Sequence, residues 1–148
     1  MKNTIIINGS HNRLGNTTQL LSKIYPDLEV IYLADHSIEL YNYSETYSKN
    51  DEFLAIINQL LKYDTIIFAT PVYWYSMSSL MKIFFDRLTD LIGSASPIGR
   101  QLIGKKVKVI TSSNGNHLGD DFFLPFAATA KYLHLNYMGG KHYVNATN

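Results

Sequence analysis

Residues 9–18 form a run of small, hydroxyl and amide side chains with the composition of an anion-binding loop. The run reads Gly-Ser-His-Asn-Arg-Leu-Gly-Asn-Thr-Thr and leads into leucines at helical spacing. Unpaired N–H groups and the positive dipole end at the start of such a helix favour an anion. Further side-chain donors come from Ser10, Asn16, Thr17 and Thr18. A phosphate, with a charge of roughly −1.5 to −2 at neutral pH, would suit this loop.

The spacing within this run separates it from two other phosphate-binding loops. It lacks the Gly-Lys-Ser/Thr ending of a nucleoside-triphosphate loop and the Gly-x-Gly-x-x-Gly of a dinucleotide-binding turn. These differences favour a monophosphate ligand. The alternative stays open at this point, because residues of these types also form a capped helix start that binds nothing.

A second loop, residues 70–78, holds three consecutive aromatic residues and reads Thr-Pro-Val-Tyr-Trp-Tyr-Ser-Met-Ser. Strand geometry would place neighbouring side chains on opposite faces, so at least one aromatic ring should face solvent. Pro71 stiffens the backbone that enters the loop. A rigid aromatic loop suits a flat heterocycle, since ring stacking contributes roughly 0.5–1.5 kcal/mol beyond burial. The alternative is an exposed aromatic patch used for dimerisation.

A third loop, residues 111–119, is rich in serine, asparagine and glycine. Small residues let a backbone approach a ligand closely, although the same residues also make ordinary turns. His11 and His117 fall in the first and third loops, where either could donate a proton to a reduced substrate. Solvated loop histidines are commoner, so His117 is a weak catalytic candidate. His134 and His142 are expected to be peripheral.

Apolar runs and helical periods alternate along the chain in a way that predicts a parallel sheet. Strands joined by helices form right-handed crossovers, which place helices on both faces of such a sheet. Asn16 is expected to cap the first helix with Gln19 completing a capping box, and Lys82 and Asp86 are expected to form a surface ion pair. The predicted strands are 4–8, 28–33, 65–70, 106–112 and 135–144, the helices 16–25, 52–62, 78–91 and 121–133, and the long loops 35–50 and 93–104.

Composition narrows the classes of protein to consider. The 148 residues suffice for one domain. The absence of cysteine excludes disulfides, thiolate metal sites and cysteine nucleophiles, and weakly favours a cytoplasmic location. A net charge of +1 without a basic block argues against nucleic acid as a partner. No apolar run approaches the length of roughly 20 residues that spans a bilayer, and no side-chain set has metal-ligand spacing.

The ligand crevice of a parallel sheet lies outside the carboxyl ends of its strands, where the three loops should converge. Here residues 9–18, together with residues 70–88, resemble the flavodoxin-like NADPH-dependent FMN reductase family and its quinone reductase and iron–sulfur flavoprotein relatives. The resemblance covers nearly the whole chain. It implies one FMN-binding α/β domain over residues 1–148, built as a three-layer sandwich with strand order 2-1-3-4-5.

The resemblance also implies which residues bind the cofactor. The phosphate would lie on the first loop, and the arginine that the family often carries there falls on Asn12 or its neighbour Arg13. The isoalloxazine ring would lie against the second loop, with the third loop closing its far edge. The implied cofactor-binding residues are Ser10, Asn12, Arg13, Asn16, Thr17, Thr18, Pro71, Val72, Tyr73, Trp74, Ser112, Ser113, Asn114 and Gly115.

Two departures from the family pattern affect what we expect. The segment 35–50 carries Tyr41, Tyr43 and Tyr47 where the iron–sulfur relatives carry cysteines, so no cluster is expected. The family's final helix, which follows strand five, is missing from the sequence. Its absence would leave part of one sheet face uncovered, and exposed apolar surface usually marks an interface. We therefore expect a second subunit, as in a homodimer, or a rearranged terminus to cover that face.

The function implied is two-electron reduction with NAD(P)H as reductant and FMN as carrier. The acceptor would be a small flat molecule such as a quinone, a flavin, or an azo or nitro compound. A non-enzymatic electron carrier like a flavodoxin is an alternative, although flavodoxins are generally strongly acidic and this chain is not. A shortened binding module that has lost its flavin is the other alternative.

Overall fold

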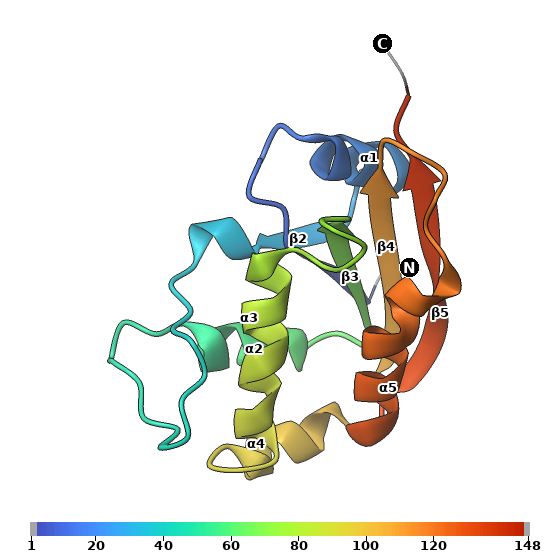
Figure 1. The fold of residues 1–148 in the computed structure, drawn as a ribbon. Helices are drawn as coiled ribbons and strands as arrows, with labels where there is room; N and C mark the ends of the chain where they lie inside the picture. The colour runs from blue at the N-terminus through green and yellow to red at the C-terminus, as the bar shows by residue number, and fades with distance from the viewer. Residues whose placement is uncertain (1–2, 147–148) are drawn as a thin grey trace.

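The computed structural model describes residues 3–146 and contains a five-stranded sheet in the order β2-β1-β3-β4-β5 (Figure 1). All four strand pairings are parallel, which confirms the predicted topology. The central strands form because their residues are apolar on both faces, as parallel strands between helical layers require. The strands are β1 (Thr4–Asn8), β2 (Glu29–Tyr32), β3 (Thr65–Pro71), β4 (Lys106–Ser113) and β5 (Asn136–Val144).

The helices agree with the predicted order, and their largest departures from the predicted bounds are in three places. The segment 93–104, predicted as a loop, contains α4 and a 3-10 turn. The α-helical part of 78–91 ends at Arg87, and the predicted helix 121–133 begins as a 3-10 turn before Pro125 enters the first α-helical turn. The elements are α1 (Asn16–Ile24), η1 (Leu33–Asp35), α2 (Phe53–Leu60), α3 (Ser79–Arg87), η2 (Leu88–Leu91), α4 (Ser96–Gly99), η3 (Arg100–Leu102), η4 (Asp120–Phe123) and α5 (Leu124–Tyr132).

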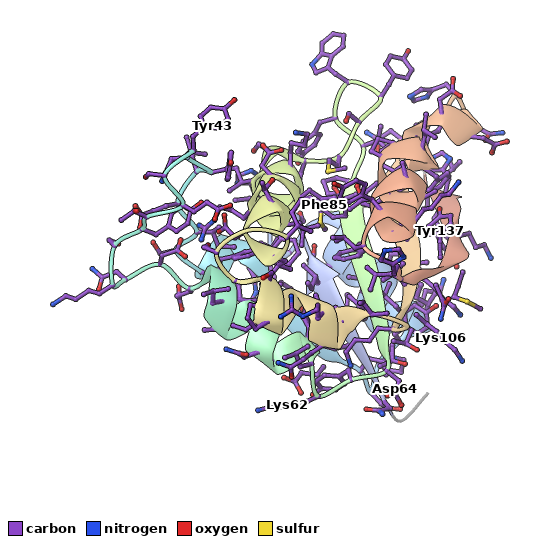
Figure 2. The ribbon with its side chains drawn as sticks, turned by 90° about the horizontal axis from the view of Figure 1, so that it is seen from below. Tyr43, Lys62, Asp64, Phe85, Lys106 and Tyr137 are labelled. Carbon is purple, nitrogen blue, oxygen red and sulfur yellow. The ribbon has the colours of Figure 1, made fainter. Side chains whose placement is uncertain are left out.

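One sheet face carries most of the hydrophobic core. Helices α2, α3 and α5 cover this face (Figure 1), where Phe68 of β3 meets Phe84, Phe85 and Phe126 with ring centroids 5.1–6.4 Å apart. Phe85 lies between α3 and α5 (Figure 2). These tilted and edge-to-face contacts fix the spacing of the helices over the sheet. None of the helices in residues 3–146 is long and apolar enough to cross a membrane.

The opposite face is covered by α1 alone, which packs on Ile6, Ile67 and Ile110. No helix follows β5 within the described residues. The β4–β5 part of this face carries Lys108, two residues before Ile110, and Lys141, which pairs with Ile110 across the strands. This part of the face therefore presents lysines, and the Lys141 ammonium lies 4.7 Å from the centre of the Tyr143 ring.

A buried arginine links α3 to the tyrosine-rich segment 35–50. Arg87 is 1% exposed. Its guanidinium donates two hydrogen bonds to Asp51, at 2.7 and 2.9 Å, and one to Asp90, at 2.8 Å. A further bond of 2.9 Å reaches the carbonyl oxygen of Glu39. The fork geometry of arginine suits this set of acceptors, whereas a lysine would satisfy only part of it.

The same arginine holds an aromatic ring of that segment in place. The Tyr47 ring lies 3.4 Å from the guanidinium carbon of Arg87, and its hydroxyl donates to Asp90 at 2.9 Å. Burial alone would raise the pKa of Asp51, but its bonds to Arg87 and to the Glu39 amide lower it overall. The Asp51 carboxylate is thus held in its charged form. The tip of the segment, at Tyr43, stands clear of the domain and is exposed (Figure 2).

Replacing Arg87 by methionine should lower the free energy of unfolding by about 3–5 kcal/mol, because two buried carboxylates would lose their common partner. Chemical denaturation monitored by circular dichroism measures this loss. The control is Lys82→Met, which removes the exposed Lys82–Asp86 pair, whose predicted contact the structure confirms at 2.6 Å; it should change stability little. Equal effects of the two substitutions would contradict the role assigned to Arg87.

Candidate active-site cleft

A cleft of about 420 Å³ opens at the carboxyl edge of the sheet, where the three predicted loops converge. It brings together ten of the fourteen predicted cofactor-binding residues and leaves out Arg13, Thr18, Trp74 and Gly115. Leu14, Gly15 and Asn145 also line it. The full lining is Ser10, Asn12, Leu14, Gly15, Asn16, Thr17, Pro71, Val72, Tyr73, Ser112, Ser113, Asn114 and Asn145.

The first loop presents an uncapped helix start to this cleft. Gly15 is the N-cap of α1, with no side-chain cap, so Asn16 does not cap the helix as predicted and is its first residue. Gln19 bonds the carbonyl oxygen of Leu14 at 2.9 Å and leaves the amides of the first turn unpaired. The Gly15 amide donates to the Asn12 carbonyl oxygen at 3.0 Å, so the amides of Asn16 and Thr17 remain for an anion in the cleft.

Side chains behind this loop fix its course. The Asn8 side chain accepts from the Ser10 amide at 2.9 Å and donates to the Thr18 hydroxyl at 3.1 Å. The Asn12 side-chain oxygen accepts from the Leu14 amide at 3.0 Å, which makes a tight local turn. Thr18 thus supports the loop from outside the cleft. These three hydrogen bonds hold the loop in this shape.

Asn12 and Arg13 were the two candidates for the family's arginine position, and the structure separates them. Asn12 lines the cleft. Arg13 turns away, pairs with Asp35, and lies 3.7 Å from the centre of the Tyr32 ring. Since none of the lining residues is charged, a phosphate in this cleft would meet amides, hydroxyls and a helix dipole.

Ser78 joins the loop after β1 to the loop after β3. Its hydroxyl donates to the carbonyl oxygen of Gly9 at 2.6 Å and accepts from the Met81 amide at 3.2 Å, which caps α3. Its amide donates to the Thr70 hydroxyl at 2.9 Å. A side chain at Gly9 would lie 3.0 Å from the Met81 Cβ, so glycine lets the two loops approach. The sequence analysis did not assign Ser78 to the site, although a serine before a helical stretch signals a cap.

The loop after β3 leaves the sheet beside β4 and then turns back on itself. The Val72 amide donates to the carbonyl oxygen of Ser112 at 3.1 Å, which keeps Val72 beside the third loop. Tyr73 pairs with Ser76 as an isolated antiparallel bridge. The tip of this turn places Trp74 94% exposed to solvent and outside the cleft lining.

The third loop is held by hydroxyls and by a histidine that the sequence analysis placed outside the site. Thr17 and Ser112 share a hydrogen bond of 3.0 Å across the cleft floor. The Ser113 hydroxyl donates to the Gly115 carbonyl oxygen at 3.0 Å and contacts His142 Nε2 at 2.7 Å. Burial lowers the pKa of His142, and nearby His117 adds to that effect, so the neutral ring is favoured.

Asn145 is a cleft residue that the sequence analysis missed. Its amide donates to the Ser113 carbonyl oxygen at 2.8 Å, and its side chain donates to Asn114 at 2.9 Å. It directly follows β5, so its place at the carboxyl end of a parallel strand was the available signal. His11 contacts Ser79 at 3.1 Å in an exposed position and does not line the cleft.

A second, larger groove lies away from the cleft. The groove, about 720 Å³, lies between the η2–η3 region and α5, and is lined largely by apolar side chains such as Leu91, Ile92 and Ile103. It lacks the converging amides of the cleft. No group of three or more potential metal-ligating side chains occurs in the described residues.

Known proteins resemble this chain in sequence and in structure. A candidate NAD(P)H-dependent FMN-containing oxidoreductase of Bacillus subtilis, YwqN, is 35% identical over 94 residues, which are 59% of this chain and 52% of that protein. An FMN-dependent NADH:quinone oxidoreductase of Burkholderia thailandensis is 34% identical over 82 residues, 51% of this chain and 41% of that protein. The chain thus spans about half the length of these relatives or less.

A solved structure extends the similarity across the fold. The Trp repressor binding protein of Bacillus subtilis superposes with a TM-score of 0.75 at 25% identity, over 96% of this chain and 83% of that one. The family model described as NADPH-dependent FMN reductase matches residues 2–141. The chain therefore belongs to the NADPH-dependent FMN reductase family.

Proposed function

We propose that this protein is an FMN-dependent NAD(P)H oxidoreductase that reduces a small flat acceptor. The single observation that supports this most strongly is the form of the cleft, which has an uncapped helix start on one side and a stiff Pro-Val-Tyr segment on the other. A phosphate and a planar ring at a fixed separation match these two halves. Family membership supports the same cofactor.

The residues present fit a flavin mononucleotide. We assign the phosphate to Ser10, Asn12, Asn16 and Thr17, with Thr18 supporting the loop from behind. Neutral donors around a buried phosphate are sufficient where amides converge at a helix start, because the bonds to an ionised acceptor are short and strong. The anion therefore needs no arginine in the cleft, and Arg13 is free to pair with Asp35.

The ring is assigned to the space between the second and third loops. Pro71, Val72 and Tyr73 would line one side, and Ser112 to Asn114 the far edge. Backbone amides of these loops can bond the polar edge of a ring, while the neutral His142 holds the Ser113 hydroxyl in place. When bound, FMN would carry two electrons from nicotinamide to acceptor; NAD(P)H, a proton and a quinone then give NAD(P)+ and a hydroquinone.

Our proposal includes a cytoplasmic location and a homodimer. The absence of cysteine favours the first. For the second, α5 exposes a row in which Leu124 and Tyr132 are 64% and 70% exposed on either side of Ala128. The row is acidic at its start, at Asp121, and basic at its end, at Lys131. Antiparallel pairing of two copies would bury this row and oppose unlike charges.

A flavodoxin-type electron carrier is the second candidate function, and the shortened binding module is the third. The fold is common to all three. The net charge of +1 differs from the strongly acidic charge that steers flavodoxins to basic partners, which counts against a carrier. The preformed cleft, whose loops are held by Asn8 and Ser78, counts against a module that has lost its flavin.

The first prediction concerns cofactor and turnover. After addition of FMN and desalting, the protein should retain about one flavin per chain by visible absorption, and should then oxidise NADH or NADPH steadily with menadione as acceptor. Colourless protein that does not quench FMN fluorescence would remove the reductase proposal and favour the binding module. Retained flavin without steady oxidation would favour the electron carrier.

The second prediction uses Asn16, which is exposed and whose side chain forms no hydrogen bond in the part of the chain that the structure describes. Asn16→Asp places a carboxylate at the start of α1, which should stabilise the helix by about 0.3–1 kcal/mol. The same charge should repel the phosphate and weaken FMN binding at least about tenfold, or 1.4 kcal/mol. Riboflavin, which has no phosphate, is the control and should bind wild type and variant alike in fluorescence titrations. Unchanged FMN affinity would contradict the assigned phosphate site.

The third prediction tests the dimer. Ala128→Arg would bring two like charges together at the centre of the α5 row, so sedimentation should show a shift from dimer to monomer. Ala55→Arg, at an exposed position of α2, is the matched control and should remain dimeric. A monomeric wild type at micromolar concentration would refute the proposed interface.

A further inference from the structure

The loop between β3 and α3 ends in a two-residue hairpin turn that is made of aromatic residues. Tyr73 and Ser76 exchange two backbone hydrogen bonds, of 2.9 and 3.1 Å. The two residues between them, Trp74 and Tyr75, have φ values of 50° and 65°. Both central residues therefore adopt the left-handed conformation that such a turn requires.

Turns of this kind are normally built from asparagine and glycine. Asparagine tolerates a positive φ and glycine has no Cβ to clash, whereas a bulky L-residue is strained in the same position. Here two bulky aromatic residues occupy both strained positions in succession. Such outliers persist where the surrounding structure enforces them, and they concentrate at functional sites.

Packing within the chain does not account for Trp74. Its side chain is 94% exposed, so the indole has almost no contact with the rest of the described residues. Tyr75 is 64% exposed, and its ring meets the His117 ring edge to face with centroids 5.4 Å apart. This contact ties the turn to the third loop of the cleft. The turn as a whole projects beyond the ends of the helices (Figure 2).

The position of the turn relates it to the cleft. Tyr73 lines the cleft, and Trp74 follows it directly in the chain. The ring side of the proposed flavin site is therefore followed in the chain by the exposed indole, and the Tyr75 ring of the turn contacts His117 of the third loop. A planar molecule approaching the open side of that site would reach this indole.

We propose that Trp74 is a specificity-determining residue that stacks the electron acceptor, and that the strained turn exists to hold it at the mouth of the cleft. The acceptor class is an uncharged planar conjugated ring system, such as a quinone. An exposed tryptophan favours this class because stacking buries two apolar faces at once. This inference rests on the proposed function and adds to it the residue that selects the substrate.

The double substitution Trp74→Asn with Tyr75→Gly removes the proposed stacking surface of Trp74, here called the platform, and keeps the turn. It installs the residues that the turn prefers, so the melting temperature should rise and FMN should still bind. The KM for menadione should increase at least about tenfold while turnover with ferricyanide, which cannot stack, stays unchanged. Trp74→Phe keeps a stacking ring and should retain a KM within about threefold of wild type.

A second measurement needs no turnover. Trp74 is the single tryptophan of the chain, so its emission reports on this position alone. Menadione should quench it saturably in the wild-type holoprotein, and a matched aliphatic diketone should not. This measurement tests the role of Trp74 separately from the reductase proposal. If the wild-type holoprotein shows saturable quenching but does not oxidise NAD(P)H, the reductase proposal is refuted and the platform is still supported.

Two results would overturn the platform. The first is an unchanged KM for menadione in the double variant, together with menadione quenching that is no more than collisional. The second is conversion of a wild-type dimer to a monomer by the double substitution, since the turn would then be an interface between two copies of the chain.

Discussion

The cleft depends most on the hydrogen bond from the Ser78 hydroxyl to the Gly9 carbonyl oxygen. Parallel strands deliver their loops to one edge of a sheet, but nothing in sheet geometry fixes the distance between those loops once the strands have ended. Ser78 sets that distance, because one hydroxyl caps α3 and at the same time bonds the backbone of Gly9. The loop after β1 and the loop after β3 are therefore one unit, and the third loop joins it through Thr17 and Ser112.

A second buried contact organises the other half of the helical layer and is independent of the cleft. Arg87 gathers Asp51, Asp90 and Glu39 around one guanidinium, so a segment without helix or strand gains a fixed course beside α3. The segment resembles a loop only in its secondary structure. Its interior end is held by the bonds to Arg87, and Tyr43 at its tip is exposed.

Much of the fold follows from features visible in the sequence. Runs such as Ile5 to Ile7 are typical of buried strands, and their alternation with amphipathic helices indicates a parallel sheet with right-handed crossovers. The strand order itself came from the family resemblance. The convergence of three loops followed from that topology. The direction of individual side chains could not be predicted in the same way. Asn12 and Arg13 are adjacent in the sequence, and Arg13 leaves the cleft because it contacts Asp35 and Tyr32.

The other features that the sequence did not predict share a physical cause: they depend on tertiary contacts and not on the conformational preferences of neighbouring residues. A single turn such as α4 has too few residues to show a helical period, and His142 gained its role only when β5 paired beside Ser113. The turn at Trp74 and Tyr75 contradicts the residue preferences of its own type, so no pattern rule could predict it.

The lysines on the uncovered β4–β5 face have a consequence for how the chain behaves among its own copies. β5 is an edge strand, and an unpaired edge is a template for adding strands from other molecules. Lys141 lies on this strand, Gly139 has a φ of 98°, and the β4–β5 register shifts between Val107 and Val109. Charge and irregularity at an edge both hinder further pairing. At the other edge, β2 has only four residues. Both borders of the sheet are thus poor starting points for strand addition between copies of the chain.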